Sequence, residues 1–170
     1  MKRACWCALA LIGLLAFGGC KGKRKPVDPT ARAEAAQNAS EADFAGQIRD
    51  YARAETLLVK AVELDPNNHI YWKALGVTHK KRGDNEGARK AYIRARDEAA
   101  ADYEESKHQN LLAIMNIVEL DVLLGDQDRA RRFLEEAAHE HPDNSELQRF
   151  VKEKVIDKML ADPSVKALSV

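Results

Sequence analysis

After residue 34, the same pattern of small and apolar residues occurs three times along the chain. Three sets of four positions share one register: Ala54, Leu58, Ala61 and Pro66; Ala88, Tyr92, Ala95 and Ala100; and Ala130, Leu134, Ala137 and Pro142. The second set follows the first by 34 residues, and the third follows the second by 42. Self-similarity at such a period is typical of a repeat architecture. We expect repeats at 35–68, 69–102 and 111–144, with an insertion at 103–110.

Within each copy the spacing of these positions predicts a helix. Residues three, four and seven apart lie on one helix face, and the recurring positions have these separations. The segments 65–68 (DPNN) and 141–144 (HPDN) separate the copies. Proline disfavours helical geometry in the residue before it, and Asn or Asp caps the helix that follows. The expected fold is therefore all-α. The polar insertion should lengthen a helix end or form an exposed loop.

An amphipathic stripe follows the third copy. The apolar residues of this stripe are Leu147, Phe150, Val151, Val155 and Ile156. Ser145 and Gln148 have the spacing of a capping box at the start of a helix. The pattern predicts a single capping helix over 145–161, which covers the last apolar face of the array, and a C-terminal tail over 162–170.

The middle copy carries a more specific signature. At the offsets W-x2-L-G-x2-Y and beyond stand Trp72, Leu75, Gly76, His79, Ala88, Tyr92 and Ala95. This pattern resembles the tetratricopeptide repeat (TPR), with His79 in place of the usual Tyr and Ala100 in place of the usual Pro. The resemblance implies a helix-turn-helix solenoid of about three repeats plus the capping helix. In such a repeat the large residues fill the space between the helices. Gly76 is expected to be small because the backbones approach closely at that position.

The N-terminal segment has the pattern of an export signal. Lys2 and Arg3 precede an uncharged, apolar stretch that ends before Cys20. At about 17 residues it is at the lower limit for a membrane-spanning helix, which is the alternative reading. Its end, residues 15–20 (LAFGGC), resembles the lipobox of bacterial lipoproteins, with Phe17 where that family usually has Leu. The resemblance implies removal of residues 1–19 and thioether-linked lipid on Cys20.

The next segment, 20–34, is interpreted as a flexible basic tether. It groups Lys21, Lys23, Arg24 and Lys25, and it contains Pro26 and Pro29, which should prevent a continuous helix. The basic residues could be a solvated spacer or could lean on an anionic lipid surface. In enteric lipoproteins an Asp after the lipidated Cys retains the protein at the inner membrane. The Lys at this place implies a lipid anchor in the outer membrane, with the protein facing the periplasm.

Charge and cysteine content narrow the possible functions. The chain has 27 Lys and Arg against 27 Asp and Glu, which excludes a strongly basic nucleic-acid binder. Cys5 and Cys7 lie in the segment to be removed, so Cys20 is the only thiol of the mature chain. An intramolecular disulfide is therefore not expected.

Two Glu-x-x-His pairs, Glu105 with His108 and Glu136 with His139, leave open a helical metal-binding protein or enzyme. This spacing puts both ligands on one helix face, but such ligands must project into a bundle interior, and Glu105 lies in a very polar segment. His139 and His141, two residues apart, point to different sides of a helix. The sequence has neither a nucleophile elbow nor a phosphate-binding glycine loop. We expect a protein that is no enzyme and has no cofactor, metal or small-molecule substrate.

The expected function is that of a membrane-anchored TPR scaffold lipoprotein, which mediates protein-protein interaction in the cell envelope. An alternative within the same class is an assembly lipoprotein of a type IV pilus or a secretion system. The resemblance implies a groove lined by the first helix of each pair, and the expected partner is a protein or peptide held in this groove. The lipid attaches the protein to the membrane. The groove residues expected from the register are Ile70, Lys73, Val77, Lys80, Lys81, Leu112, Met115, Asn116, Glu119 and Val122.

The chemistry of these groove residues indicates what they would bind. The lysines of the second copy favour an acidic stretch, and Leu112, Met115 and Val122 favour apolar side chains. The apolar members could equally pack against the neighbouring helix pair. A clamp for a C-terminal carboxylate is not expected, because Ala39, Asp43 and Leu112 occupy three of the positions where some relatives have the Lys, Asn and Arg residues of such a clamp.

The lipid anchor gives a direct test. Replacing Cys20 with Ser removes the acylated side chain, so Cys20→Ser should release the protein from membranes or leave it uncleaved. Membrane fractionation and the mass of the product measure both outcomes. A Cys20→Ser protein that is processed and fractionates with membranes as before would contradict the lipid anchor.

Overall fold

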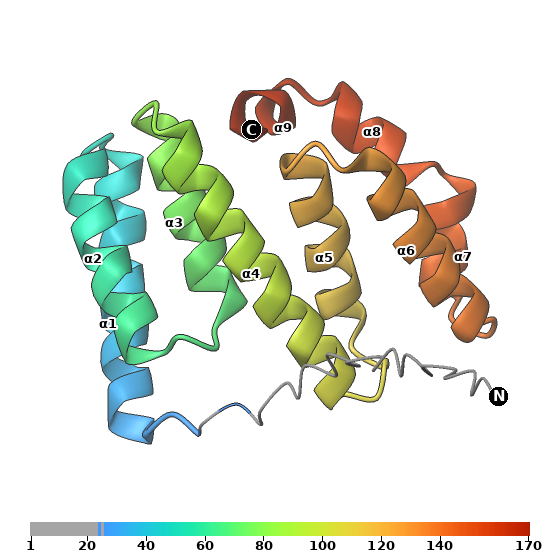
Figure 1. Cartoon of the computed structure of the whole chain (residues 1–170), viewed down its shortest axis with the longest axis horizontal. Helices are drawn as coiled ribbons and strands as arrows, with labels where there is room; N and C mark the ends of the chain where they lie inside the picture. The colour runs from blue at the N-terminus through green and yellow to red at the C-terminus, as the bar shows by residue number, and fades with distance from the viewer. Residues whose placement is uncertain (1–23, 25) are drawn as a thin grey trace, which may run out of the picture.

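The computed structural model describes Arg24 and residues 26–170. These residues form nine helices and no strand (Figure 1): α1 (Pro29–Gln47), α2 (Tyr51–Leu64), α3 (His69–Lys81), α4 (Asn85–Glu105), α5 (Leu111–Leu123), α6 (Gln127–Glu140), α7 (Ser145–Lys152), α8 (Val155–Ala161) and α9 (Pro163–Leu168). The predicted all-α class is confirmed. The predicted signal at 1–19 and the predicted lipidation site Cys20 lie outside the described residues. Within the described part of the chain, no helix is both long and apolar enough to cross a membrane.

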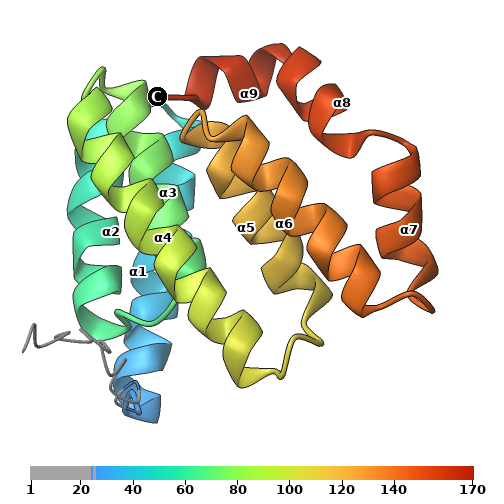
Figure 2. The same cartoon turned by 45° about the vertical axis from the view of Figure 1, so that its right-hand side comes forward.

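The first six helices form three antiparallel pairs, α1 with α2, α3 with α4, and α5 with α6. The second helix of each pair also packs on the first helix of the next, so every pair is in contact with its neighbour in the chain. In Figure 2, α2, α4 and α6 form one layer and α1, α3 and α5 lie behind them. The first helices therefore share one face of the array.

The turn inside each pair repeats in the same register as the sequence. Its last residue has a positive φ in all three copies: Arg49 at 62°, Gly83 at 84° and Gly125 at 80°. The residue that follows is the N-cap of the second helix and is always Asp: Asp50, Asp84 and Asp126. Glycine adopts this left-handed conformation without steric cost. The first copy uses Arg49 instead and is the least regular of the three.

The recurring small residues form the contact between the helices. The three positions that recur as Ala, as Leu or Tyr, and as Ala are buried in every copy: Ala54, Leu58 and Ala61; Ala88, Tyr92 and Ala95; and Ala130, Leu134 and Ala137. The register read from the sequence is thus confirmed by burial. Trp72 is only partly buried, and its Nε1 donates a hydrogen bond to the Pro66 carbonyl at 2.9 Å. Gly76 faces the ring of Tyr92, not another backbone.

The N-terminal boundary differs from the predicted one. Helix α1 begins at Pro29, whereas the sequence interpretation placed residues up to 34 in a flexible tether. The Asp28 carboxylate caps the helix by accepting hydrogen bonds from the backbone amides of Thr30 and Ala31. Proline is tolerated at the first helical position, because the amide it lacks would have no partner there. Pro29 therefore starts the helix that it was expected to prevent.

The insertion is divided between a helix and a loop. Its first residues extend α4 to Glu105, and residues 106–110 form the connection to α5. Tyr103, the first residue of the insertion, is buried in the core cluster of the third copy. The lengthening of a helix end is confirmed, but the added turn is also part of the core.

The C-terminal prediction is wrong in two respects. The expected single capping helix is broken into α7 and α8 at Lys154, which has φ 50°. The expected tail instead forms α9 and returns to α3 and α5 (Figure 1). The Tyr92 hydroxyl donates to the Leu168 carbonyl at 3.2 Å, and the Val170 amide donates to the Leu123 carbonyl at 2.9 Å. Val165 and Leu168 also make apolar contacts, so the C-terminal segment covers the ends of the helices on which it packs.

The contact between Gly76 and Tyr92 predicts a steric effect. In Gly76→Ala the new Cβ would lie 2.5 Å from the Tyr92 ring, which is fully buried and cannot move freely. Overpacking of this kind costs about 1–3 kcal/mol, so the melting temperature measured by circular dichroism should fall by several degrees.

Gly46→Ala is the matched control. A Cβ on Gly46 would meet nothing within 4 Å, and alanine is the better helix former. This variant should be as stable as the parent or more so. Equal stability of the two variants would contradict the described packing of Tyr92.

Candidate functional site

A groove lies between α1 and α3, with α2 beneath it. Its volume is about 560 Å³. Because α1 and α3 scarcely touch one another, the space between them is left open. The side of α1 is lined by small residues, Ala39, Ala42 and Gly46, which leave room for an occupant. The side of α3 contributes Tyr71 and Val77, so the interior of the groove is largely apolar.

Polar groups surround this apolar interior. On α1, the Gln47 amide donates to the Asp43 carboxylate at 2.8 Å. On α3, Lys73 and Lys81 line the groove. Burial raises the pKa of Tyr71, and the charge of Asp65 adds to the effect, so this side chain is neutral at physiological pH. The site combines an apolar slot with charges of both signs at its edges.

The α3 residues predicted for the groove fall into two groups. Ile70, Lys73, Val77 and Lys81 line it, whereas Lys80 does not, and Ile70 is 49% exposed. Two of the lysines have partners within the chain: Lys73 Nζ donates to Asn116 Oδ1 at 3.1 Å and to Glu119 Oε2 at 2.9 Å. Lys80 Nζ donates to Asn85 Oδ1 at 2.8 Å. These bonds occupy two of the three lysines that were expected to attract an acidic partner.

The α5 residues predicted for the groove do not line this cavity. Leu112 is 62% exposed, Met115 and Glu119 are partly buried, and Asn116 is buried. Val122 is only 1% exposed because it packs in the core of the third copy, so its assignment to the groove is wrong. The bonds from Lys73 do bring Asn116 and Glu119 beside α3, as the register implied.

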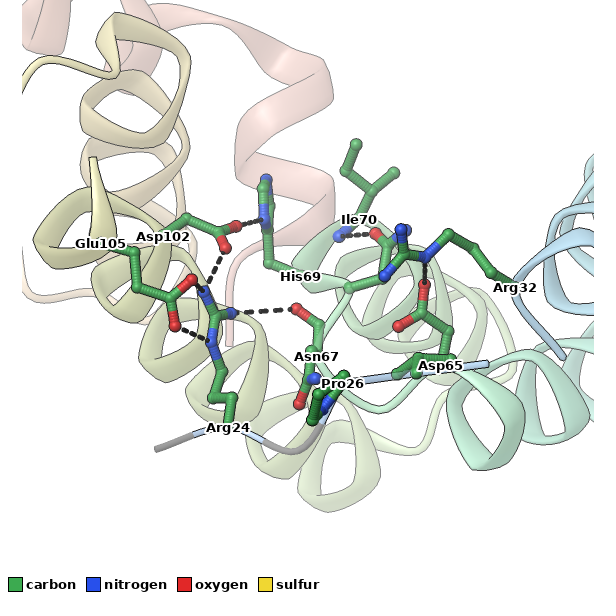
Figure 3. A pocket seen from close by; sticks show the side chains of 11 residues that line it. Arg24, Pro26, Arg32, Asp65, Asn67, His69, Ile70, Asp102 and Glu105 are labelled. Atoms are coloured by element: carbon green, nitrogen blue, oxygen red, sulfur yellow. Dashed lines mark hydrogen bonds and ion pairs between the residues drawn. The ribbon is translucent and has the colours of Figure 1, made fainter. Parts of the chain in front are cut away.

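A second cavity, here called the end cavity, lies where α3 begins and α4 ends. It has a volume of about 520 Å³ and is lined by charged residues together with Pro26, Val27 and Ile70 (Figure 3). His69 Nδ1 lies 2.7 Å from Asp102 Oδ2, and Arg24 binds the same carboxylate. Burial acts to raise the pKa of Asp102, but the hydrogen bonds from His69 and Arg24 outweigh it and lower the pKa. The end cavity therefore holds an ionised carboxylate.

No family model matches this chain, and no curated protein matches it significantly. The geometry of the described residues therefore carries the functional argument.

The side chains of the alternative metal centre have other surroundings. Glu105 is bound by Arg24, and His108 lies between Glu104 and Glu140. Glu136 and His139 are exposed on α6. In the described part of the chain, no three His, Cys, Asp or Glu residues are grouped so that they could hold a metal ion. The two Glu-x-x-His pairs thus do not form a shared centre.

The insertion forms a cluster around His108. Its Nδ1 lies 3.0 Å from Glu140 Oε2 and its Nε2 lies 3.3 Å from Glu104 Oε2. The ring stacks on Tyr103 with a centroid separation of 4.4 Å, and the Tyr103 hydroxyl donates to the same Glu140 oxygen at 3.1 Å. Two carboxylates facing the two ring nitrogens favour the doubly protonated imidazolium. The cluster joins the end of α4 to the end of α6.

Sequence reasoning missed the α1 side of the groove and the contacts of Arg24. The α1 side consists of small residues, which carry no chemical signal in a sequence. A signal for the early start of α1 was present in Asp28 followed by Pro29, the pattern of an N-cap and a first helical position. No local pattern indicates that Arg24 binds acidic residues more than 70 positions away.

The His108 cluster predicts a pH-dependent stability. Its hydrogen bonds, with Glu140 first and Glu104 second, raise the pKa of His108. A raised folded-state pKa stabilises the fold fully below the unfolded value of about 6.5, and this contribution disappears as the pH rises through the folded value. The loss of melting temperature in His108→Asn should therefore be larger at about pH 6 than at about pH 9.

Asparagine is chosen because it tolerates the positive φ of 66° at His108. The control is His139→Asn, on the exposed surface of α6, which should show little difference between the two pH values. A loss in His108→Asn that does not depend on pH would contradict the charged state assigned to the ring.

Proposed function

We propose that the protein is a lipid-anchored adaptor of the bacterial cell envelope, which holds a segment of another protein in the groove between α1 and α3. The anchor is Cys20, and the protein faces the periplasm from the outer membrane. Binding is the whole activity proposed. The observation that carries the proposal is the groove itself, a largely apolar space of about 560 Å³ between two helices that scarcely touch.

We further propose that the helix pairs are tetratricopeptide-type repeats. Three observations support this assignment. The pairs recur with the same buried positions, the same left-handed turn residue and the same Asp cap. The middle copy has the signature from Trp72 to Ala95, and its Gly76 accommodates the Tyr92 ring. The first helix of each pair lies on the shared face that contains the groove.

The occupant follows from the chemistry of the lining. Burying an exposed apolar side chain such as that of Ile70 against a partner is favourable by about 1.5–3 kcal/mol. We therefore assign the groove to an amphipathic helix or an extended segment with Leu-like side chains directed between α1 and α3. Lys81 at the edge favours an acidic residue in that segment. Lys73 and Lys80 contribute less than their charges suggest, because Glu119 and Asn85 bind them.

The test replaces one apolar residue of the groove. Ile70→Ser removes a half-exposed side chain, so the fold should keep its melting temperature within a few degrees, while affinity for the partner segment falls about tenfold or more. The partner is captured first, from cells, with a photo-crosslinking residue at Gln47, on the edge of the groove. The affinity of the captured segment is then measured by titration.

Two matched positions serve as controls. Leu112→Ser makes the same kind of change on α5, outside the groove, and should leave the affinity unchanged. A photo-crosslinking residue at the exposed Arg89 of α4 should not capture the same partner. Equal loss of affinity in the Ile70 and Leu112 variants, or equal capture from Gln47 and Arg89, would contradict binding in the groove.

A further inference from the structure

Arg24 is held by the end of α4 through an unusual number of contacts. Its Nε donates to Glu105 Oε1 at 2.9 Å and one terminal nitrogen binds Asp102 Oδ1 at 2.7 Å (Figure 3). The other terminal nitrogen lies 3.3 Å from Glu98 Oε2. The last nitrogen also points at the carbonyl oxygens of Asn67 and Glu98. The Arg24 side chain is only 17% exposed. We call this arrangement the Arg24 clasp.

The Arg24 clasp differs from an ordinary surface ion pair. An exposed pair contributes little because both side chains lose freedom and water screens the charges. Here one guanidinium binds three carboxylates, and the Glu98 side chain is only 6% exposed. The planar guanidinium presents several donors in a rigid arrangement, so a single side chain can satisfy all these acceptors. The clasp therefore fixes the position of the backbone at residue 24.

The chain remains close to the array after Arg24. Pro26 and Val27 line the end cavity, and Asp28 then caps α1. In α1, Arg32 lies 3.9 Å from Asp65, between α2 and α3. The segment before α1 is thus bound at Arg24 on α4 and again at the start of α1. It passes over one end of the array, which contains the connections at 65–68 and 106–110; we call this the anchor end.

The distance to Cys20 is limited by covalent geometry. Cys20 lies four positions before Arg24, and a fully extended chain over four residue steps spans at most about 14 Å. A lipid on Cys20 therefore lies within that distance of the Arg24 backbone. The turns that contain Gly83 and Gly125 are at the opposite end of the array, so the length of the helices separates them from the anchor end (Figure 1).

We propose that the Arg24 clasp orients the protein on the membrane, with the anchor end facing the lipid surface and the opposite end directed away from it. This inference rests on the proposed lipidation of Cys20. The clasp also places a positive charge among Glu98, Asp102 and Glu105, which would otherwise be repelled by anionic headgroups. Since α1 and α3 both begin at the anchor end, the groove between them extends away from the membrane, and a bound segment does the same.

The orientation is tested by energy transfer in vesicles. In the mature lipidated protein Cys20 carries the lipid, so an introduced cysteine is the only free thiol to label. Gln109→Cys lies at the anchor end and Gln127→Cys at the opposite end, both exposed and separated by the length of α5, about 20 Å. The protein is bound to phosphatidylcholine vesicles that contain an acceptor dye on the headgroup. Transfer from Gln109→Cys should exceed transfer from Gln127→Cys by about twofold or more, given that separation.

Variants of the clasp show whether Arg24 causes the orientation. Arg24→Ala should bring the two transfer efficiencies close together, because the free tether then extends from Cys20 to Asp28 and its reach of up to about 28 Å exceeds the separation of the two labels. The combined change Asp102→Asn with Glu105→Gln should have the same effect, because it removes two of the negative charges that bind Arg24. Arg32→Ala is the matched control, since Arg32 is 64% exposed and has a single long contact; it should preserve the difference. Circular dichroism establishes that each variant is folded.

Each outcome bears on one proposal or the other. Equal transfer from the two positions in the parent protein, or higher transfer from Gln127→Cys, would overturn the orientation. A difference that survives in Arg24→Ala would overturn the role of Arg24. Flotation of the same samples measures the lipid anchor separately: protein that does not float with the vesicles contradicts the lipidation of Cys20 and removes the basis of the orientation. Protein that floats without a preferred orientation contradicts the clasp alone.

Discussion

The packing of the Tyr92 ring against Gly76 is the contact on which most of the described structure depends. It determines how closely α3 and α4 approach, because any side chain at position 76 would displace the ring. The other side of Tyr92 belongs to a core cluster with Leu120 and Leu123 of α5. Its hydroxyl binds the Leu168 carbonyl in the returning C-terminal segment. One side chain thus joins the middle pair, the third pair and α9.

The insertion between the second and third copies makes two separate sets of contacts. By extending α4, it places Tyr103 in the core of the third copy and Glu105 beside Arg24. Its loop then brings His108 to Glu140 at the end of α6. The extra turn of α4 therefore links the segment before α1 with the last helix pair. A repeat of standard length would lack Tyr103 and Glu105, and the end cavity would lose part of its wall.

The groove and the orientation are related through α1. This helix is rich in alanine, so it packs closely on α2 but leaves space toward α3. Its start is held at the anchor end by the Asp28 cap. In the proposed function, the same helix therefore forms one wall of the binding site and connects that wall to the lipid. A segment bound in the groove would be positioned relative to the membrane without any movement of the array.

The sequence by itself determined the helical class, the repeat register and the positions where α3, α5 and α7 begin. It could do so because caps and helical periodicity involve neighbours within a few residues, as Asp84 before α4 and Ala88 on its buried face illustrate. Only the tertiary structure decided which apolar residues of α5 are exposed to solvent. That helix is apolar on most sides, so its pattern does not distinguish the buried Val122 from the exposed Leu112 until α4, α6, α8 and α9 pack around it.

The same limit explains the other differences between the expected and the observed structure. The partners of Lys73 lie 43 and 46 residues away, and the carboxylates bound by Arg24 lie 74 to 81 residues away, beyond any local pattern. The return of the chain at Lys154 and the docking of α9 likewise depend on surfaces that exist only after the three pairs have assembled. Local periodicity specifies elements, whereas the groove, the clasp and the cover over the helix ends arise from contacts between distant parts of the chain.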